Sequence, residues 1–123
     1  MAKQISIDET YLQDTLIQLL NIPSPTGYTD AAIQYVESKL DDLGLVSRQT
    51  PKGTLVAEWP GKKEDKPRGL TAHIDTLGAM VSEIKPSGRL KLTQLGMYTW
   101  NTIEGEGCRI LTRSGRTIRG SVL

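Results

Sequence analysis

The chain has 123 residues, of which 37% are hydrophobic and 24% are charged, and this balance is typical of one ordinary globular unit. The single cysteine, Cys108, excludes a disulfide scaffold, and the formal net charge of +1 excludes a global field that would draw the chain to nucleic acid or acidic lipid. No hydrophobic run approaches the ~20 residues of a membrane span, and residues 1–6 lack the features of a secretory signal. We therefore expect a cytoplasmic protein with no membrane or nucleic-acid partner.

The first part of the chain predicts two amphipathic helices. Asp8 is a favourable N-cap, and leucines at helical spacing predict a helix over residues 9–20. Two prolines and a glycine exclude residues 23–27 from a helix. A second helix is expected to begin after Thr29 and to end near Gly44, because a glycine adopts the left-handed C-cap conformation readily.

The middle of the chain predicts strands. Residues 45–49 and 54–59 flank the turn-like residues 50–53, which indicates an antiparallel hairpin. A polar, lysine-rich loop over residues 60–68 then leads to residues 69–74. This last segment is short and mostly apolar, as is typical of a strand inside an open α/β sheet.

After residue 78 the helical signals disappear, and short strands alternate with glycine turns. Residues 79–85 and 89–95 predict one hairpin, and residues 108–112 and 117–123 predict another. This pattern favours a small all-β barrel or sandwich.

The change of pattern places a domain boundary at Ile84. The fold class is therefore expected to be α/β, with residues 1–84 forming the beginning of an α/β domain and residues 85–123 forming part of a small all-β barrel. The final residues, up to Leu123, alternate like a strand and have no turn, cap or polar tail, so we expect a truncated chain.

The single histidine, His73, lies two residues before Asp75 at the end of the predicted strand 69–74. The carboxyl ends of strands in open α/β sheets line the ligand crevice, and side chains two residues apart in an extended segment lie on the same side. A ligating imidazole usually donates its other N–H to a carboxylate, so the pair suits a metal site, for which zinc is the natural ion. One histidine and one aspartate do not complete such a site, and a structural histidine is the alternative.

A second candidate site lies in the last predicted hairpin. It contains four arginines within eleven residues, namely Arg109, Arg113, Arg116 and Arg119. A stripe of this kind in a small barrel binds nucleic-acid phosphates in some proteins. Few aromatic residues accompany it, since aromatics make up 5% of the chain and phenylalanine is absent. The scarcity of aromatic residues disfavours stacking of bases, but the arginines still leave a nucleic-acid-binding or assembly module as the alternative to a metal site.

Residues 71–81 contain His-x-Asp-x-x-Gly and run into the Lys-Pro-x-Gly-Arg turn of residues 85–89. This combination closely resembles the glutamyl and deblocking aminopeptidases, a family of di-zinc metallopeptidases that includes tetrahedral assemblies. Residues 16–27 look like the opening helix and loop of that family, and residues 102–108 and 112–116 look like its inserted β domain. The resemblance covers nearly the whole chain.

The resemblance implies a metalloaminopeptidase, a hydrolase that removes N-terminal residues from peptide substrates. His73 would ligate one of two zinc ions, for which cobalt or manganese are alternatives, and Asp75 would act in catalysis as the orienting carboxylate. Two metals would polarise the scissile carbonyl, and a glutamate would take the proton of a shared water. The remaining ligands and this glutamate follow the inserted domain in the family, so we expect residues 1–123 alone to be inactive.

The resemblance also has consequences for domains and partners. Residues 1–84 would be the N-terminal part of a zinc-exopeptidase-type catalytic domain, and residues 85–123 part of an inserted β-barrel that mediates assembly into a homo-oligomer. A related group of zinc deacylases and carboxypeptidases shares His-x-Asp, but its inserted domain is an α/β lobe, which the all-β pattern after residue 78 disfavours. Many relatives have an acidic pair where this chain has Thr76 and Leu77, which leaves the subgroup open.

Overall fold

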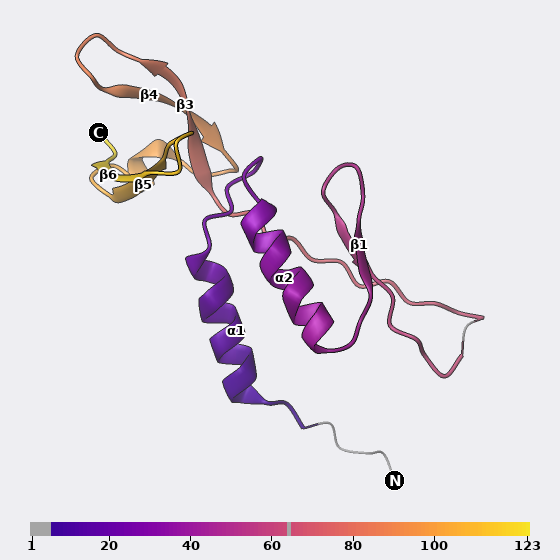
Figure 1. Cartoon of the computed structure of the whole chain (residues 1–123). Helices are drawn as coiled ribbons and strands as arrows, with labels where there is room; N and C mark the ends of the chain where they lie inside the picture. The colour runs from indigo at the N-terminus through magenta and orange to yellow at the C-terminus, as the bar shows by residue number, and fades with distance from the viewer. Residues whose placement is uncertain (1–5, 64) are drawn as a thin grey trace.

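The computed structural model describes residues 6–63 and 65–123. Within these ranges the chain forms two α-helices, one short 3-10 helix and six strands, which are arranged in three two-stranded sheets (Figure 1). Residues 1–5, which carry most of the sequence argument against a secretory signal, and Glu64 of the predicted polar loop lie outside the described residues. No helix in the described ranges is long and apolar enough to cross a membrane.

Both predicted helices are confirmed, as α1 (Glu9–Asn21) and α2 (Asp30–Asp42). The Asp8 carboxylate accepts a hydrogen bond from the Tyr11 amide at 2.9 Å and so caps α1. Gly44 has a φ of +71° and donates its amide to the Asp41 carbonyl at 2.8 Å, which is the left-handed C-cap expected after α2. The structure therefore confirms the two local signals that delimit these helices.

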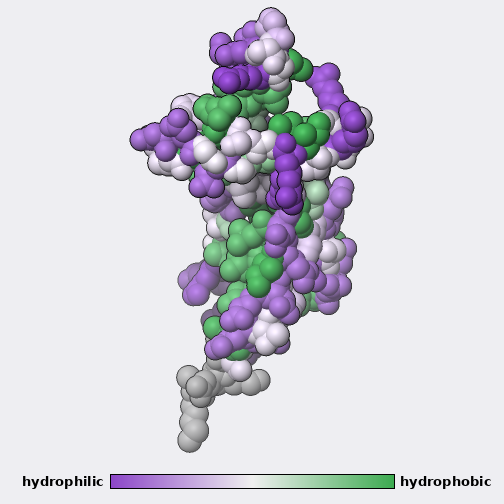
Figure 2. Space-filling view, turned by 90° about the vertical axis from the view of Figure 1, so that its left-hand side faces the viewer, coloured by the Kyte–Doolittle hydropathy of each residue, from purple (hydrophilic) through white to green (hydrophobic). Residues whose placement is uncertain are grey.

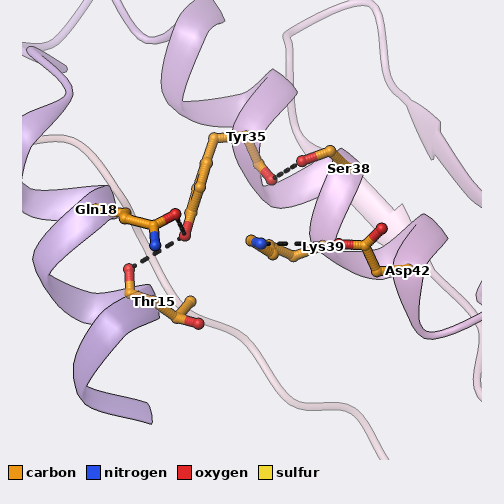
Figure 3. Close-up of polar contacts among 6 residues, drawn as sticks. All are labelled: Thr15, Gln18, Tyr35, Ser38, Lys39 and Asp42. Atoms are coloured by element: carbon orange, nitrogen blue, oxygen red, sulfur yellow. Dashed lines mark hydrogen bonds and ion pairs between the residues drawn. The ribbon is translucent and has the colours of Figure 1, made fainter. Parts of the chain in front are cut away.

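The two helices contact one another through Tyr35 of α2 (Figure 3). Its hydroxyl lies 3.1 Å from Gln18 Oε1 and 3.4 Å from the Thr15 carbonyl oxygen, both in α1. On the same side of α2, Lys39 Nζ lies 5.4 Å from the centre of the Tyr35 ring and 3.7 Å from Asp42 Oδ2. The Tyr35 hydroxyl is thus the polar link between the two helices, and the Lys39 contacts stay within α2.

All three predicted hairpins are confirmed, with ends that differ by one to a few residues from those expected. The strands are β1 (Ser47–Gln49) with β2 (Leu55–Ala57), β3 (Gly78–Ile84) with β4 (Leu90–Leu95), and β5 (Gly107–Leu111) with β6 (Thr117–Ser121). The 3-10 helix η1 (Trp100–Thr102) lies between the second and third hairpins. A positive-φ glycine closes the turn of each hairpin, for example Gly115 at +77°.

The predicted inner strand over residues 69–74 is wrong. These residues form no strand, and the nearest regular pairing is an isolated parallel bridge between Pro25 and Thr76. An inner strand needs a hydrogen-bonded neighbour on each side, and every described strand instead pairs with its own hairpin partner. Leu70 of this segment is 98% exposed.

The α/β class agrees with the mixture of helices and strands, but the described strands do not close into a barrel. β3 and β4 form one two-stranded sheet and β5 and β6 another, without pairing between the two. A barrel would require such pairing between hairpins. The predicted boundary at Ile84 falls at the tip of the β3–β4 hairpin, where the Lys85 amide donates to the Arg89 carbonyl. The hairpin therefore continues across this position, and the division into domains 1–84 and 85–123 stays a prediction.

The hydrophobic faces of these elements are largely open to solvent. Among the described residues only Ala32 and Ser24 are buried, whereas the leucines that give α1 its amphipathic pattern are mostly exposed. Figure 2 shows hydrophobic groups distributed over the face in view, between polar ones. Exposed apolar area of this extent is rare on a monomeric globular protein, so these faces have the character of contact surfaces.

Candidate functional site

A loop between the two helices holds the segment that carries His73. The Ser24 hydroxyl donates to the Ile74 carbonyl oxygen at 2.8 Å, and the Thr76 amide donates to the Ser24 carbonyl oxygen at 2.9 Å. Ser24 is only 2% exposed, which makes these the best-protected contacts of the loop. The loop and the segment therefore run side by side over residues 24–25 and 74–76, as the bridge between Pro25 and Thr76 also indicates.

The sequence of residues 23–27 explains why the chain turns here. Pro23 and Pro25 have no backbone N–H, so they cannot continue the hydrogen bonding of α1. Gly27 has a φ of +85°, and the Tyr28 amide closes a turn onto the Pro25 carbonyl at 2.8 Å. The chain therefore leaves α1 and turns at residues 25–28.

The predicted pair of His73 and Asp75 is brought together. His73 Nδ1 lies 3.1 Å from Asp75 Oδ1, and the Thr26 hydroxyl donates to Asp75 Oδ2 at 3.1 Å. The His73 side chain is 82% exposed and that of Asp75 is 46% exposed. One carboxylate thus contacts both an exposed imidazole and a residue of the opening loop.

These contacts have an electrostatic consequence at Asp75. The hydrogen bond from Thr26, followed by that with His73, lowers the pKa of the Asp75 carboxyl below its ordinary value. Both contacts stabilise the charged form, which is the form that accepts a hydrogen bond from an imidazole N–H. Asp75 is therefore kept as a carboxylate beside His73.

The donor set fits a metal site in kind but supplies only part of one. An imidazole whose Nδ1 faces a carboxylate presents Nε2 to a metal, as ligating histidines usually do. Across residues 6–63 and 65–123, however, no group of three or more His, Cys, Asp or Glu side chains is close enough to hold an ion. The described residues therefore bring together one imidazole and one carboxylate, which are fewer groups than a metal site requires.

The four arginines of the alternative site lie on the β5–β6 hairpin and its turn. Arg109 and Arg119 are directly opposite one another in the strand register, and Arg113 and Arg116 lie at the turn. All four side chains are exposed, and none forms an ion pair with a residue that the structure describes. Like charges directly opposite one another are mildly destabilising. An anion bound between Arg109 and Arg119 would reduce this repulsion, because it would neutralise part of their positive charge.

Two contributors to the site were not found from the sequence. Thr26 and Ser24 belong to a Ser-Pro-Thr-Gly stretch, which by itself indicates only a turn. Their contacts with Asp75 and Ile74 span 49 and 50 positions of sequence, and no local spacing encodes such a pairing. The resemblance of residues 16–27 to a family loop was the only available signal.

Comparison with known proteins gives a consistent set of matches. A family model described as M42 glutamyl aminopeptidase matches residues 53–123. The "Putative aminopeptidase YhfE" of Bacillus subtilis (strain 168) is 48% identical over 106 residues, which cover 86% of this chain and 31% of that protein. The "Glutamyl aminopeptidase" of Lactococcus lactis subsp. cremoris (strain MG1363) is 28% identical over 108 residues, covering 87% and 30% respectively.

The fold is also similar to a solved structure. That of PhTET1-12s, a dodecamer in the asymmetric unit, matches with a TM-score of 0.74 and 20% identity over 88% of this chain and 32% of the other. At this level of identity the likeness concerns the fold alone. The chain spans about a third of the length of each of these proteins.

Proposed function

Because the chain belongs to the M42 glutamyl aminopeptidase family, we propose that it is the N-terminal part of a metal-dependent aminopeptidase that hydrolyses N-terminal residues from peptides. The observation that carries the proposal is the contact of 3.1 Å between His73 Nδ1 and Asp75 Oδ1, within a segment held against the opening loop. The identity of 48% to an aminopeptidase relative supports it independently.

The two site residues have distinct roles in this proposal. His73 would hold one metal through Nε2, and Asp75 would accept a hydrogen bond from Nδ1–H and so fix the ring orientation. Two zinc ions, or cobalt or manganese in their place, would polarise the scissile carbonyl and lower the pKa of a bound water. The His73 side chain is 82% exposed, so its ring is accessible to a metal that residues from other parts of a longer chain would also bind.

We further propose that residues 1–123 alone do not catalyse the reaction. A di-metal site needs several more ligands and a general base than the pair that this chain provides. An isolated 123-residue chain that released amino acids from peptides, with loss of that activity on chelation, would refute this.

Assembly and location are part of the same proposal. The exposed apolar faces of α1 and of the hairpins are the surfaces on which further parts of the protein or further subunits would pack. The fold likeness to PhTET1-12s, which is a dodecamer, supports a homo-oligomer. We propose residues 85–123 as part of an assembly domain of barrel type, in a cytoplasmic enzyme.

The test uses the full-length protein that contains this chain, with an amino acid p-nitroanilide as the substrate. His73→Ala should reduce turnover to the background rate, and Asp75→Asn should reduce it by about 10- to 100-fold, as for other carboxylates that orient a ligating histidine. Lys52→Ala is the control, since Lys52 is an exposed residue of the β1–β2 turn and belongs to neither candidate site. Wild-type turnover in His73→Ala would contradict the proposal.

The arginine hairpin is the second candidate, as a nucleic-acid-binding or assembly module. The exposed, directly opposed Arg109 and Arg119 favour it. Binding of a single-stranded oligonucleotide that weakens steeply with salt would support this candidate, because such binding rests on phosphate contacts. The family match favours the aminopeptidase, both over this candidate and over the related deacylases and carboxypeptidases.

A further inference from the structure

We propose that Thr26 is a positioning residue for His73 and that it acts through Asp75. The inference rests on the proposed role of His73 as a ligand and adds a residue of the opening loop to that site. Its basis is a continuous chain of contacts from the Thr26 hydroxyl to Asp75 Oδ2, and from Asp75 Oδ1 to His73 Nδ1, each of 3.1 Å.

Two hydrogen bonds hold the Asp75 carboxylate, one at each oxygen. Asp75 is 46% exposed, so water competes for its oxygens and its side chain has room to rotate. A carboxylate that is bound through one oxygen can still turn about that contact. Because Thr26 and His73 bind different oxygens, the carboxylate plane is fixed at both ends.

The contact with Asp75 also selects a tautomer of the His73 imidazole. A carboxylate accepts but does not donate, so a neutral His73 must carry its proton on Nδ1 to bond with Asp75. That tautomer leaves Nε2 unprotonated and able to bind a metal. In free histidine the proton prefers Nε2, and the Asp75 contact therefore opposes the intrinsic preference of the ring.

The opening loop is fixed without the help of the Thr26 side chain. Ser24 holds the segment through its hydroxyl and its carbonyl. Pro25 packs against Gly78 so closely that a Cβ atom at position 78 would lie 2.6 Å from Pro25 Cβ. Removal of the Thr26 hydroxyl is therefore expected to release one oxygen of the Asp75 carboxylate and to leave the backbone of the loop in place.

The test is a nitrogen NMR measurement of the His73 tautomer at a pH of about 9, where ordinary histidine side chains are neutral. His73 is the single histidine of the chain, so its signals need no assignment. The wild type and Thr26→Ser should be mainly the Nδ1–H tautomer. Thr26→Val should lower the ratio of Nδ1–H to Nε2–H by about threefold, the effect of losing one modest hydrogen bond.

The matched control is Thr93→Val. Thr93 is an exposed β4 residue for which the described contacts include no side-chain hydrogen bond, and it undergoes the same change of side chain. Exchange of the Thr76 amide, which bonds to the Ser24 carbonyl, reports whether the loop has stayed in place. The control should leave both readouts at their wild-type values.

Two results would overturn the inference. One is a wild-type His73 that is mainly Nε2–H, and the other is a Thr26→Val tautomer ratio equal to that of the wild type. If Thr26→Val also speeds exchange at Thr76, Thr26→Ser decides the question, since a shifted tautomer in the presence of a hydroxyl contradicts the mechanism. The measurement uses neither metal nor substrate, so its failure is distinct from a loss of peptidase activity in the full-length protein.

Discussion

The β5–β6 hairpin and the segment around His73 are stabilised by contacts of different range. In the hairpin, strand pairs and a turn join residues that are neighbours in sequence, as where the Arg116 amide bonds to the Thr112 hydroxyl at 3.0 Å. At the His73 segment, the hydrogen bonds from Ser24 and Thr26 join residues 50 and 49 positions apart. Local contacts form at small entropic cost, whereas each long-range contact closes a large loop. The hairpin is therefore robust, and the site depends on a few bonds.

The largest effect is expected from Gly78→Ala. The added methyl group would lie 2.6 Å from Pro25 Cβ, and the proline ring cannot rotate away, so the loop must shift at a cost of about 1–3 kcal/mol. Exchange of the Thr76 amide should accelerate by at least about fivefold, while the β5–β6 amides stay protected. Gly69→Ala is the control, since nothing lies within 4 Å of a Cβ atom there. Equal exchange in the two variants would mean that Pro25 does not rest on Gly78.

A smaller effect is expected from Ser24→Ala. The change removes one buried hydrogen bond to the Ile74 carbonyl and should weaken the attachment of the segment by about 1 kcal/mol. The matched control is Ser38→Ala, which removes a bond of the same length, 2.8 Å, to the Tyr35 carbonyl within α2. Amide exchange at Thr76 should be faster in the first variant alone. A Ser24→Ala protein with wild-type exchange would show that the backbone bond suffices.

The smallest effect is expected from acidification. The pKa of Asp75 is depressed by Thr26 and His73, so its contacts add stability above the ordinary carboxyl pKa, and this stability is lost as the pH falls below about 4. Chemical shifts of Thr26 and Thr76 should titrate in that range, whereas those of the β5–β6 turn should not follow them. Asp75→Asn should abolish the titration. A titration that persists in Asp75→Asn would assign it to another carboxyl group.

The same difference in range explains what the sequence could predict. Asp8, Gly44 and Gly115 act on residues within one turn of themselves, and the helix caps and hairpins that they mark are all confirmed. Residues 69–74 had the composition of an inner strand, but a strand forms only by pairing with a neighbour, and none of the described strands pairs with them.

In the candidate site, too, the contact between residues close in sequence was predicted, and the contact between distant residues was not. His73 and Asp75 are two positions apart in the sequence, so their spacing indicated a contact, which the structure shows at 3.1 Å. Thr26 could not be found from spacing, because its contact with Asp75 depends on how the opening loop packs against a distant segment. The family resemblance indicated that loop without indicating the role of its threonine.

The close approach at Gly78 also limits how this sequence can change over time. Pro25 Cβ would lie 2.6 Å from a Cβ on one side of Gly78, and the Tyr98 hydroxyl donates to the Gly78 carbonyl at 2.8 Å. A larger residue at position 78 should cost less stability when position 25 carries a smaller one. Substitutions at positions 25 and 78 should therefore occur together in related sequences. The residue types that the opening loop accepts at position 25 depend on the absence of a side chain at position 78.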